Sequence, residues 1–302
     1  MKRLLLLLLV CLVTALPNLA QTKPVAFINA RIIPIVGQPI EQGILLVQNG
    51  KITAIGDART VRLSSDVMIV VQPTVTATLQ VISARQFGLI HLVDLPAPAQ
   101  FIIGFVLMDL MFYYWHRANH KIPFLWRFHN VHHIDPDLDV STAFRFHFGE
   151  VAMSAGFRVV QIALIGVAPL TYAIYELVFQ ANTLFQHSNV RLPVRIERLL
   201  NKILVTPRMH GIHHSGILCE TNSNYSVVFP WWDMLHRTLR LNIPQSRIVI
   251  GIPGYAAAAD NRLGNALLLP FVRQRNYWQR VDGTKLQRNP ADIKIPMGAM
   301  AE

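Results

Sequence analysis

The pattern of apolar and polar residues divides the chain into two parts of different character. Residues 24–82 contain three segments rich in Val, Ile and Thr, which are residue types that favour strands. The dipeptide Asn49-Gly50 lies inside the second segment and is a strong signal for a hairpin turn. None of the segments carries a histidine, a pair of carboxylates or a phosphate-binding loop. We therefore expect short strands without chemistry over residues 26–35, 43–57 and 67–82.

Long apolar runs replace the strand pattern in the second part of the chain. Residues 99–115 include one acidic residue and predict a helix about 25 Å long, slightly shorter than the hydrocarbon core of a bilayer at about 30 Å. Residues 151–186 form the longest apolar tract, and Pro169 near its middle predicts two helices in a tight hairpin. Arg158 and Glu176 lie inside this tract, so they need partners or a water-filled face.

The first 20 residues form a further apolar run. They begin with Met, Lys and Arg, continue with leucine-rich sequence and break at Pro17. This is the form of a secretory signal peptide. We expect residues 1–20 to be a signal peptide or an uncleaved anchor.

Composition favours a membrane setting over a nucleic-acid partner. The chain is 52% hydrophobic and 15% charged, against about 25% charged in ordinary soluble domains. Its net charge is +11, and basic residues such as Arg117, Lys121 and Arg127 lie beside the apolar runs. The positive-inside rule predicts this arrangement for cytoplasmic loops. Two cysteines are too few for a disulfide scaffold or a Cys-ligated zinc site.

Histidines are concentrated in one stretch, since ten of the 12 lie between positions 116 and 214. HRANH (116–120) places two of them at i and i+4, while HNVHH (129–133) and HGIHH (210–214) each place three at i, i+3 and i+4. Each set therefore shares one face of a helix. Imidazole binds iron, copper, nickel and zinc, and eight imidazoles exceed the needs of one tetrahedral zinc. The spacing predicts two metal ions with open positions for a small reactant.

His147 and His187 bracket the apolar tract of residues 151–186. If that tract enters the membrane and returns, both histidines come back to the side of the two triplets. The predicted ligand set then rises to ten, or about five for each metal, and His91 and His236 remain outside it. The predicted ligands are His116, His120, His129, His132, His133, His147, His187, His210, His213 and His214.

The three histidine motifs resemble the histidine boxes of the membrane fatty acid hydroxylase and sterol desaturase superfamily. The segments DLMFYYWHR, TAFRFHFGE, FQHSNVRLP and TNSNYSVVFPWWDML are also similar, so the resemblance covers about residues 87–275. It implies a helical membrane protein in which the ten histidines hold two iron ions. These would activate dioxygen to hydroxylate or desaturate a fatty acyl chain or a sterol.

The resemblance also implies an external source of electrons. The sequence has no Gly-x-Gly-x-x-Gly dinucleotide fingerprint, so we expect a separate reductase or a ferredoxin-like donor. Asp109, Asn224 and Asp233 are candidates for holding imidazole tautomers or the backbone near the ligands.

The predicted fold is mostly α: an integral membrane helical bundle with a histidine-rich metal site facing the cytoplasm, and a small β-rich amino-terminal segment. The expected divisions are a leader at 1–20, a β-rich fragment at 21–82, a hydroxylase-like membrane domain at 87–275 and a tail at 276–302.

Two other functions compete with lipid oxidation. Residues 26–35 and 48–57 resemble the amino-terminal β region of secreted amidohydrolases, which suggests a metal hydrolase. The His-x-His motif of that family is missing, because His91 stands alone. The other alternative is a catalytically inactive, metal-binding fusion protein. Iron content and dioxygen-dependent conversion of a lipid distinguish these functions.

Overall fold

A computed structural model describes residues 25–32, 40–48, 51–57, 68–70 and 73–288. The chain forms two compact units, Met1–Ala77 and Thr78–Glu302. The leader predicted over residues 1–20 lies outside the described residues.

The first unit contains a four-stranded sheet in the order β3-β2-β1-β4. Its strands are β1 (Val25–Ile32), β2 (Ile40–Gln48), β3 (Lys51–Asp57) and β4 (Met68–Val70). β2 pairs antiparallel with both β1 and β3, whereas β4 is parallel to β1. Gln48 is the register partner of Lys51, so two residues separate the paired ends of β2 and β3.

The strand predicted over residues 67–82 was wrong for its second half. Helix α2 (Pro73–Arg85) occupies those positions instead. Proline is well suited to the first turn of a helix, because its missing N–H is not needed there and its φ is already near the helical value. The Val and Thr content suggested a strand, but β-branched residues are only mildly unfavourable in helices.

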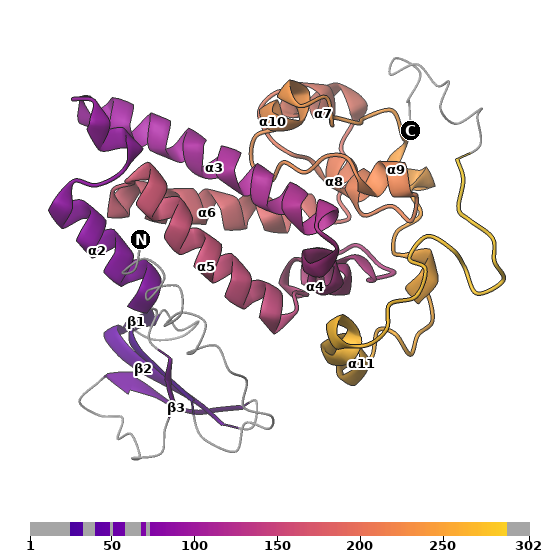
Figure 1. Ribbon diagram of the computed structural model, residues 1–302, viewed down its shortest axis with the longest axis horizontal. Coiled ribbons are helices and arrows are strands. Elements are labelled where there is room, and N and C mark those ends of the chain that lie inside the picture. The colour runs from indigo at the N-terminus through magenta and orange to yellow at the C-terminus, as the bar shows by residue number, and fades with distance from the viewer. Residues whose placement is uncertain (1–24, 33–39, 49–50, 58–67, 71–72, 289–302) are drawn as a thin grey trace. The chain divides into compact units, whose positions relative to one another are not determined.

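Helices make up most of the second unit (Figure 1). The long ones are α3 (Ala97–Lys121), α5 (Phe148–Ile165) and α6 (Pro169–Gln186). The short ones are α4 (Pro123–His133), α7 (Val194–Leu200), α8 (Pro207–His213), α9 (Leu218–Thr221), α10 (Trp231–Leu235) and α11 (Leu263–Leu268). Single 3-10 turns are η1 (Leu89–Leu92), η2 (Val140–Phe144), η3 (Gln245–Arg247), η4 (Pro253–Tyr255) and η5 (Leu269–Phe271).

The long helices bring their ends to the short helices that carry the histidine motifs. α3 packs on α4, α5 and α6, while α6 packs on α8. Figure 1 shows α4 and α8 near the ends of α3, α5 and α6. The predicted helix over residues 99–115 is confirmed within α3, and the predicted division at Pro169 is confirmed because α6 begins there. Gly166 ends α5 with φ +83°, a left-handed conformation that glycine adopts without strain.

Two of these helices have the length and composition of membrane spans. α3 and α5 each contain an 18-residue window with a mean hydropathy of 1.4, and 22% of each window is buried. Much of their apolar surface is therefore not covered by the rest of the described chain; Ile102 on α3 and Val151 on α5 are exposed examples. A bilayer would cover such surface at little cost.

The two charged residues inside the apolar tract are partners of each other. Arg158 Nη2 on α5 lies 3.0 Å from Glu176 Oε1 on α6. The guanidinium also lies over the rings of Phe112 and Phe179, with its central carbon 4.7 and 4.8 Å from their centroids. The ion pair and the two rings hold α3, α5 and α6 together, and Arg158 also donates to the Gln161 side chain.

Removing this guanidinium should destabilise the bundle. We expect Arg158→Ala to lower the free energy of unfolding by about 3 kcal/mol, because Glu176 would lose the opposite charge that offsets its own. The thermal denaturation midpoint of detergent-solubilised protein measures the change. Arg158→Lys keeps the charge but not the planar contact with the rings. Its denaturation midpoint should therefore lie between those of the parent and the alanine variant. An unchanged midpoint in the alanine variant would show that the pair does not hold the helices together.

Candidate metal centre

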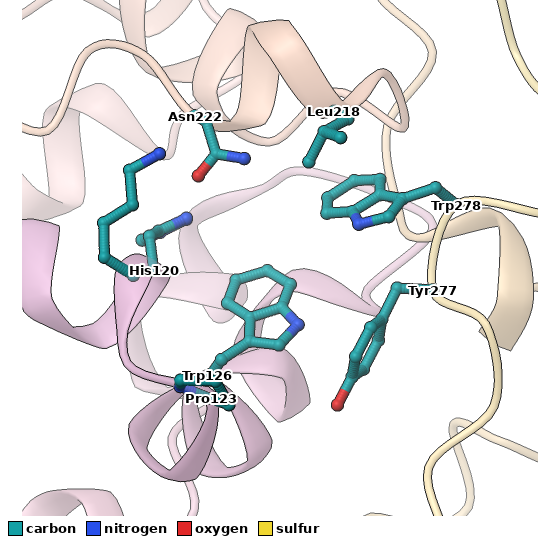
Figure 2. A pocket seen from close by; sticks show the side chains of 8 residues that line it. His120, Pro123, Trp126, Leu218, Asn222, Tyr277 and Trp278 are labelled. Carbon is teal, nitrogen blue, oxygen red and sulfur yellow. The ribbon is translucent and has the colours of Figure 1, made fainter.

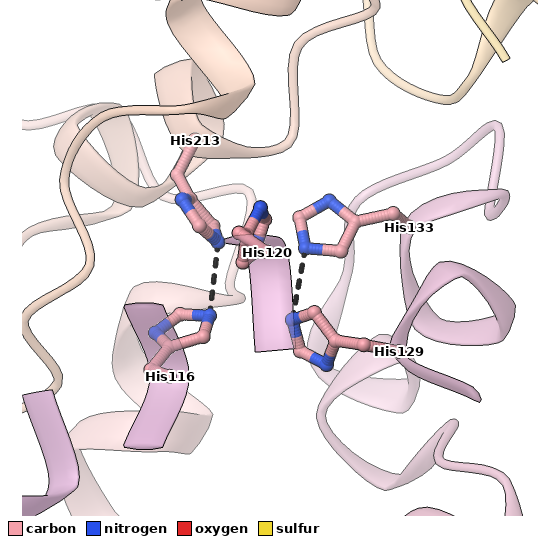
Figure 3. A group of neighbouring side chains, drawn as sticks. All are labelled: His116, His120, His129, His133 and His213. Carbon is pink, nitrogen blue, oxygen red and sulfur yellow. Dashed lines mark hydrogen bonds between the residues drawn. The ribbon is translucent and has the colours of Figure 1, made fainter. Parts of the chain in front are cut away.

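Nine of the ten predicted histidines gather into two compact groups. The first group is His116, His120, His129, His133 and His213, and the second is His132, His187, His210 and His214. Within each group, one ring nitrogen from every residue lies within 4.8 Å of the others. Figure 3 shows the first group, with five imidazoles from α3, α4 and α8 turned toward one another. Separations of this size allow all members of a group to reach one metal ion.

Helix geometry distributes each His-x-x-His-His triplet between both groups. α4 supplies His129 and His133 to the first group and His132 to the second. α8 and the residue after it supply His213 to the first group and both His210 and His214 to the second. Positions i and i+4 lie on nearly the same side of a helix, whereas adjacent residues differ by about 100°. Two short helices thereby serve two sites.

The last turns of the long helices complete the groups. α3 contributes His116 and His120, which are one turn apart near its carboxyl end. His187 directly follows α6 and joins the second group. The Pro169 break therefore has the predicted result for His187, which returns to the histidine triplets.

Burial keeps the imidazoles neutral, which is the form that binds a metal. Loss of hydration lowers the pKa of His213 to about 3 and that of His187 to about 4. The same burial, reinforced by neighbouring imidazoles, lowers the pKa well below the usual value for His132, His133, His210 and His214. A protonated ring would be both poorly hydrated and repelled by its neighbours here.

Hydrogen bonds to the outer ring nitrogens determine which nitrogen faces inward with a lone pair. His116 Nδ1 donates to the Tyr225 carbonyl oxygen and His213 Nδ1 donates to the Ser223 carbonyl oxygen, both at 2.7 Å. In a neutral imidazole the other nitrogen, Nε2, is then an acceptor. The Nε2 atoms of His116 and His213 face each other at 3.0 Å. Two acceptors cannot share a proton that neither carries, so a cation between them fits this pair.

The second group has the same inward arrangement. His187 Nδ1 donates to the Thr183 carbonyl oxygen at 2.7 Å, which leaves its Nε2 as an acceptor. That Nε2 lies 3.0 Å from His210 Nε2 and 3.2 Å from His132 Nε2. His214 Nε2 in turn lies 3.1 Å from His210 Nε2. Ring nitrogens packed this closely without a shared proton fit a cation between them, so this donor set also fits a bound metal.

A carboxylate that the sequence analysis missed supports the first group. Glu150, in the first turn of α5, accepts a 2.7 Å hydrogen bond from His129 Nδ1. Both side chains are buried. A carboxylate behind a ligating imidazole fixes its tautomer and raises its basicity. The available signal was an acidic residue at the start of an otherwise apolar tract, two positions after a conspicuous aromatic-His-aromatic segment.

The three polar residues proposed from the sequence hold backbone near the site and do not touch the imidazoles directly. Asp233 accepts from the backbone N–H groups of Tyr225 and Ser226, and so positions the carbonyl that His116 uses. Asp109 accepts from the Trp232 indole N–H at 2.7 Å and from the backbone N–H groups of Val228 and Phe229. Asn224 donates to the carbonyl oxygens of Met209 and Arg240.

Three other histidines lie outside both groups. His147 precedes α5: its Nδ1 accepts from the Gly149 N–H, while its Nε2 lies 3.1 Å from the Leu267 carbonyl oxygen. It caps the helix at its first turn, a role that its place beside the apolar tract did not reveal. His91 contacts the Gly166 carbonyl oxygen, and His236 contacts the Tyr114 hydroxyl.

Comparisons with known proteins find similarity to lipid-modifying hydroxylases. Residues 101–238 match the family model "Fatty acid hydroxylase". The ornithine lipid hydroxylase OlsE of Rhizobium tropici is 34% identical over 54% of this chain and 48% of its own length. Human cholesterol 25-hydroxylase is 29% identical over 45% of this chain and 49% of its own length. Human alkylglycerol monooxygenase is 30% identical over 54% of this chain and 35% of its own length. No solved structure matches the chain significantly.

These relatives are lipid hydroxylases or monooxygenases by name, and the chain spans about half the length, or less, of each of them. The matched residues 101–238 run from within α3 to just beyond α10 and include every member of the two histidine groups. They lie outside the four-stranded sheet, so the match does not bear on the amidohydrolase-like segment.

Proposed function

We propose that this chain is an integral membrane oxygenase that uses two iron ions and dioxygen to hydroxylate or desaturate a lipid, either a fatty acyl chain or a sterol. The observation that carries the proposal is the pair of buried histidine groups, whose inward nitrogens are lone-pair donors facing one another. The matched family and the names of the relatives support lipid as the substrate.

The donor set favours iron over a structural zinc ion. Five imidazoles in one group exceed the four positions of a closed tetrahedral zinc site, and no thiolate lies in either group. Imidazole ligands suit iron that must change oxidation state and keep a position open. When bound, the two iron ions would supply the oxidising power, with electrons from a separate reductase or ferredoxin-like donor.

The residues of the chain contribute position, dryness and charge. Backbone carbonyls and Glu150 hold ring orientation, while Asp233 and Asp109 hold the loop that presents the Tyr225 carbonyl. Burial of the histidines excludes water that would compete with substrate. The reacting part of the lipid has to approach through a gap in this shell.

The proposed membrane setting follows from the helix ends. Both histidines of α3 lie near its carboxyl end, and His187 lies just after α6. The exposed apolar lengths of α3 and α5 would then lie in the bilayer, with the metals near its edge. Lys121 and Arg127 close to the site favour its cytoplasmic side.

Metal analysis and isotope labelling test the proposal together. Purified protein should contain about two iron ions per chain, measured by elemental mass spectrometry. Cells that express the chain with a suitable electron donor under ¹⁸O₂ should contain a lipid carrying one ¹⁸O atom or a new double bond. Bound iron with no change in any lipid would favour an inactive metal-binding protein. A chain that binds zinc and hydrolyses amides would contradict the proposal.

A further inference from the structure

A small cavity opens beside the first histidine group. Its volume is about 190 Å³, and its lining includes His120, Lys121, Trp126, Asn222, Tyr277 and Trp278. Figure 2 shows His120 and Asn222 on one side of it, Tyr277 and Trp278 on the other, and the Trp126 ring between them. His120 is the member of the first group that is not fully buried. The cavity therefore reaches the proposed metal site through one of its ligands.

Aromatic rings form a continuous wall of this cavity. The Trp126 and Trp278 rings are stacked with centroids 6.1 Å apart, and the Tyr277 ring lies 5.8 Å from Trp126. Trp126 in turn lies 4.9 Å from the His120 ring. Lys121 and Asn222 supply the polar part of the lining. The cavity thus offers an apolar surface that leads to His120, with polar side chains near the same ligand.

The segment that carries Tyr277 and Trp278 is held firmly in place. The Gly254 N–H donates to the Tyr277 carbonyl oxygen at 2.9 Å, and a side chain at Gly254 would collide with the Asn276 backbone. Further along, Arg288 makes a two-pronged ion pair with Glu220, at 3.0 and 2.7 Å.

The Glu220 end of that ion pair is tied to the last histidine motif. Glu220 also accepts from the hydroxyl of Ser215, the residue after His214. Residues 276–288 are therefore fastened to the metal-binding loop, although they lie outside the family match at 101–238.

From this arrangement we infer that residues 276–288 complete the substrate site, and that Trp278 and Tyr277 select the hydrocarbon segment that reaches the first metal. The inference rests on the proposed function and adds to it the residues that decide specificity. Ligand pockets that enclose a whole small molecule are usually about 300–1,000 Å³. The smaller cavity here fits a stretch of hydrocarbon from a larger lipid. Lys121 and Asn222 in its lining would face polar atoms elsewhere in that lipid.

Photolabelling tests the cavity without requiring turnover. The full-length protein in detergent micelles is irradiated with palmitic acid carrying a diazirine on its chain, and the labelled peptides are mapped by mass spectrometry. We expect label on the peptides that contain Trp126 and Trp278. In Trp278→Ala the yield at Trp126 should fall about five- to tenfold through the loss of aromatic contact. Label confined to the exposed apolar helices, with none at these two positions, would overturn the inference.

Kinetics of matched variants supply the second measurement. Trp278→Ala should raise the KM for lipid or change the position of oxidation while iron content stays at the parental level, and Trp278→Phe should restore most of the loss. Trp231→Ala is the control, because Trp231 is exposed, stacks on Phe229 and lies outside the cavity lining. Unchanged KM and products in Trp278→Ala would reject the inference and leave the proposed function standing. A parent chain without lipid oxidation would reject the proposed function, and the labelling pattern would still judge the cavity.

Discussion

Replacing His213 by alanine is expected to abolish lipid oxidation and to empty the first metal position. His213 Nε2 faces His116 Nε2 at 3.0 Å, and its ring is held from behind by the Ser223 carbonyl. Loss of a ligand should cost more than the roughly 10- to 100-fold in metal affinity that loss of a group behind a ligand costs. We expect about one iron ion or fewer per chain and activity below about 1% of the parent.

Two controls accompany this experiment: recovery of the variant from the membrane fraction, and the same substitution at a histidine outside both groups. The His213→Ala chain should still be recovered from the membrane fraction, because α3 and α5 are unchanged. His91→Ala should keep both iron ions, since His91 contacts a backbone carbonyl at Gly166 and belongs to neither group. A His213 variant with full iron, or a His91 variant that loses iron, would show that the ligand set is misassigned.

Glu150→Gln should produce the second large effect. The amide keeps the shape of the side chain but removes the negative charge that His129 Nδ1 contacts at 2.7 Å. We expect iron affinity to fall about 10- to 100-fold, because the imidazole becomes a weaker base and its tautomer is less firmly fixed. Competition with a ferrous chelator measures the change. Asp139→Asn is a suitable control, because Asp139 bonds to Ser141 and lies outside both groups. Equal chelator resistance in parent and Glu150→Gln would remove the carboxylate from the metal centre.

Much of the candidate site was predictable because its residues follow helical spacing. The i, i+3, i+4 triplets predicted helices that present imidazoles on one face, and Pro169 predicted the break that returns His187 to them. The sharing of each triplet between two groups was not predicted. It depends on how α4 and α8 are rotated about their axes, which packing against α3 and α6 decides.

The parts that could not be predicted depend on contacts between distant segments. His129 and Glu150 are 21 positions apart, and their meeting depends on the path from α4 through η2 to α5. Backbone carbonyls such as those of Ser223 and Tyr225 have no signature in a sequence. His147 satisfied the same pattern argument as His187, yet local capping at α5 takes up its ring. The helix over residues 73–85 was not predicted, because its residue types favour a strand although the proline that starts it favours a helix.

The sharing of α4 and α8 between the two proposed metal positions has a consequence for how the protein would be loaded with iron in cells. Filling one position would orient helices that also carry ligands of the other, so the second ion would bind more readily than the first. Most chains would then hold either two iron ions or none, and few would hold one. Iron scarcity would reduce the number of working molecules and leave the speed of each one unchanged.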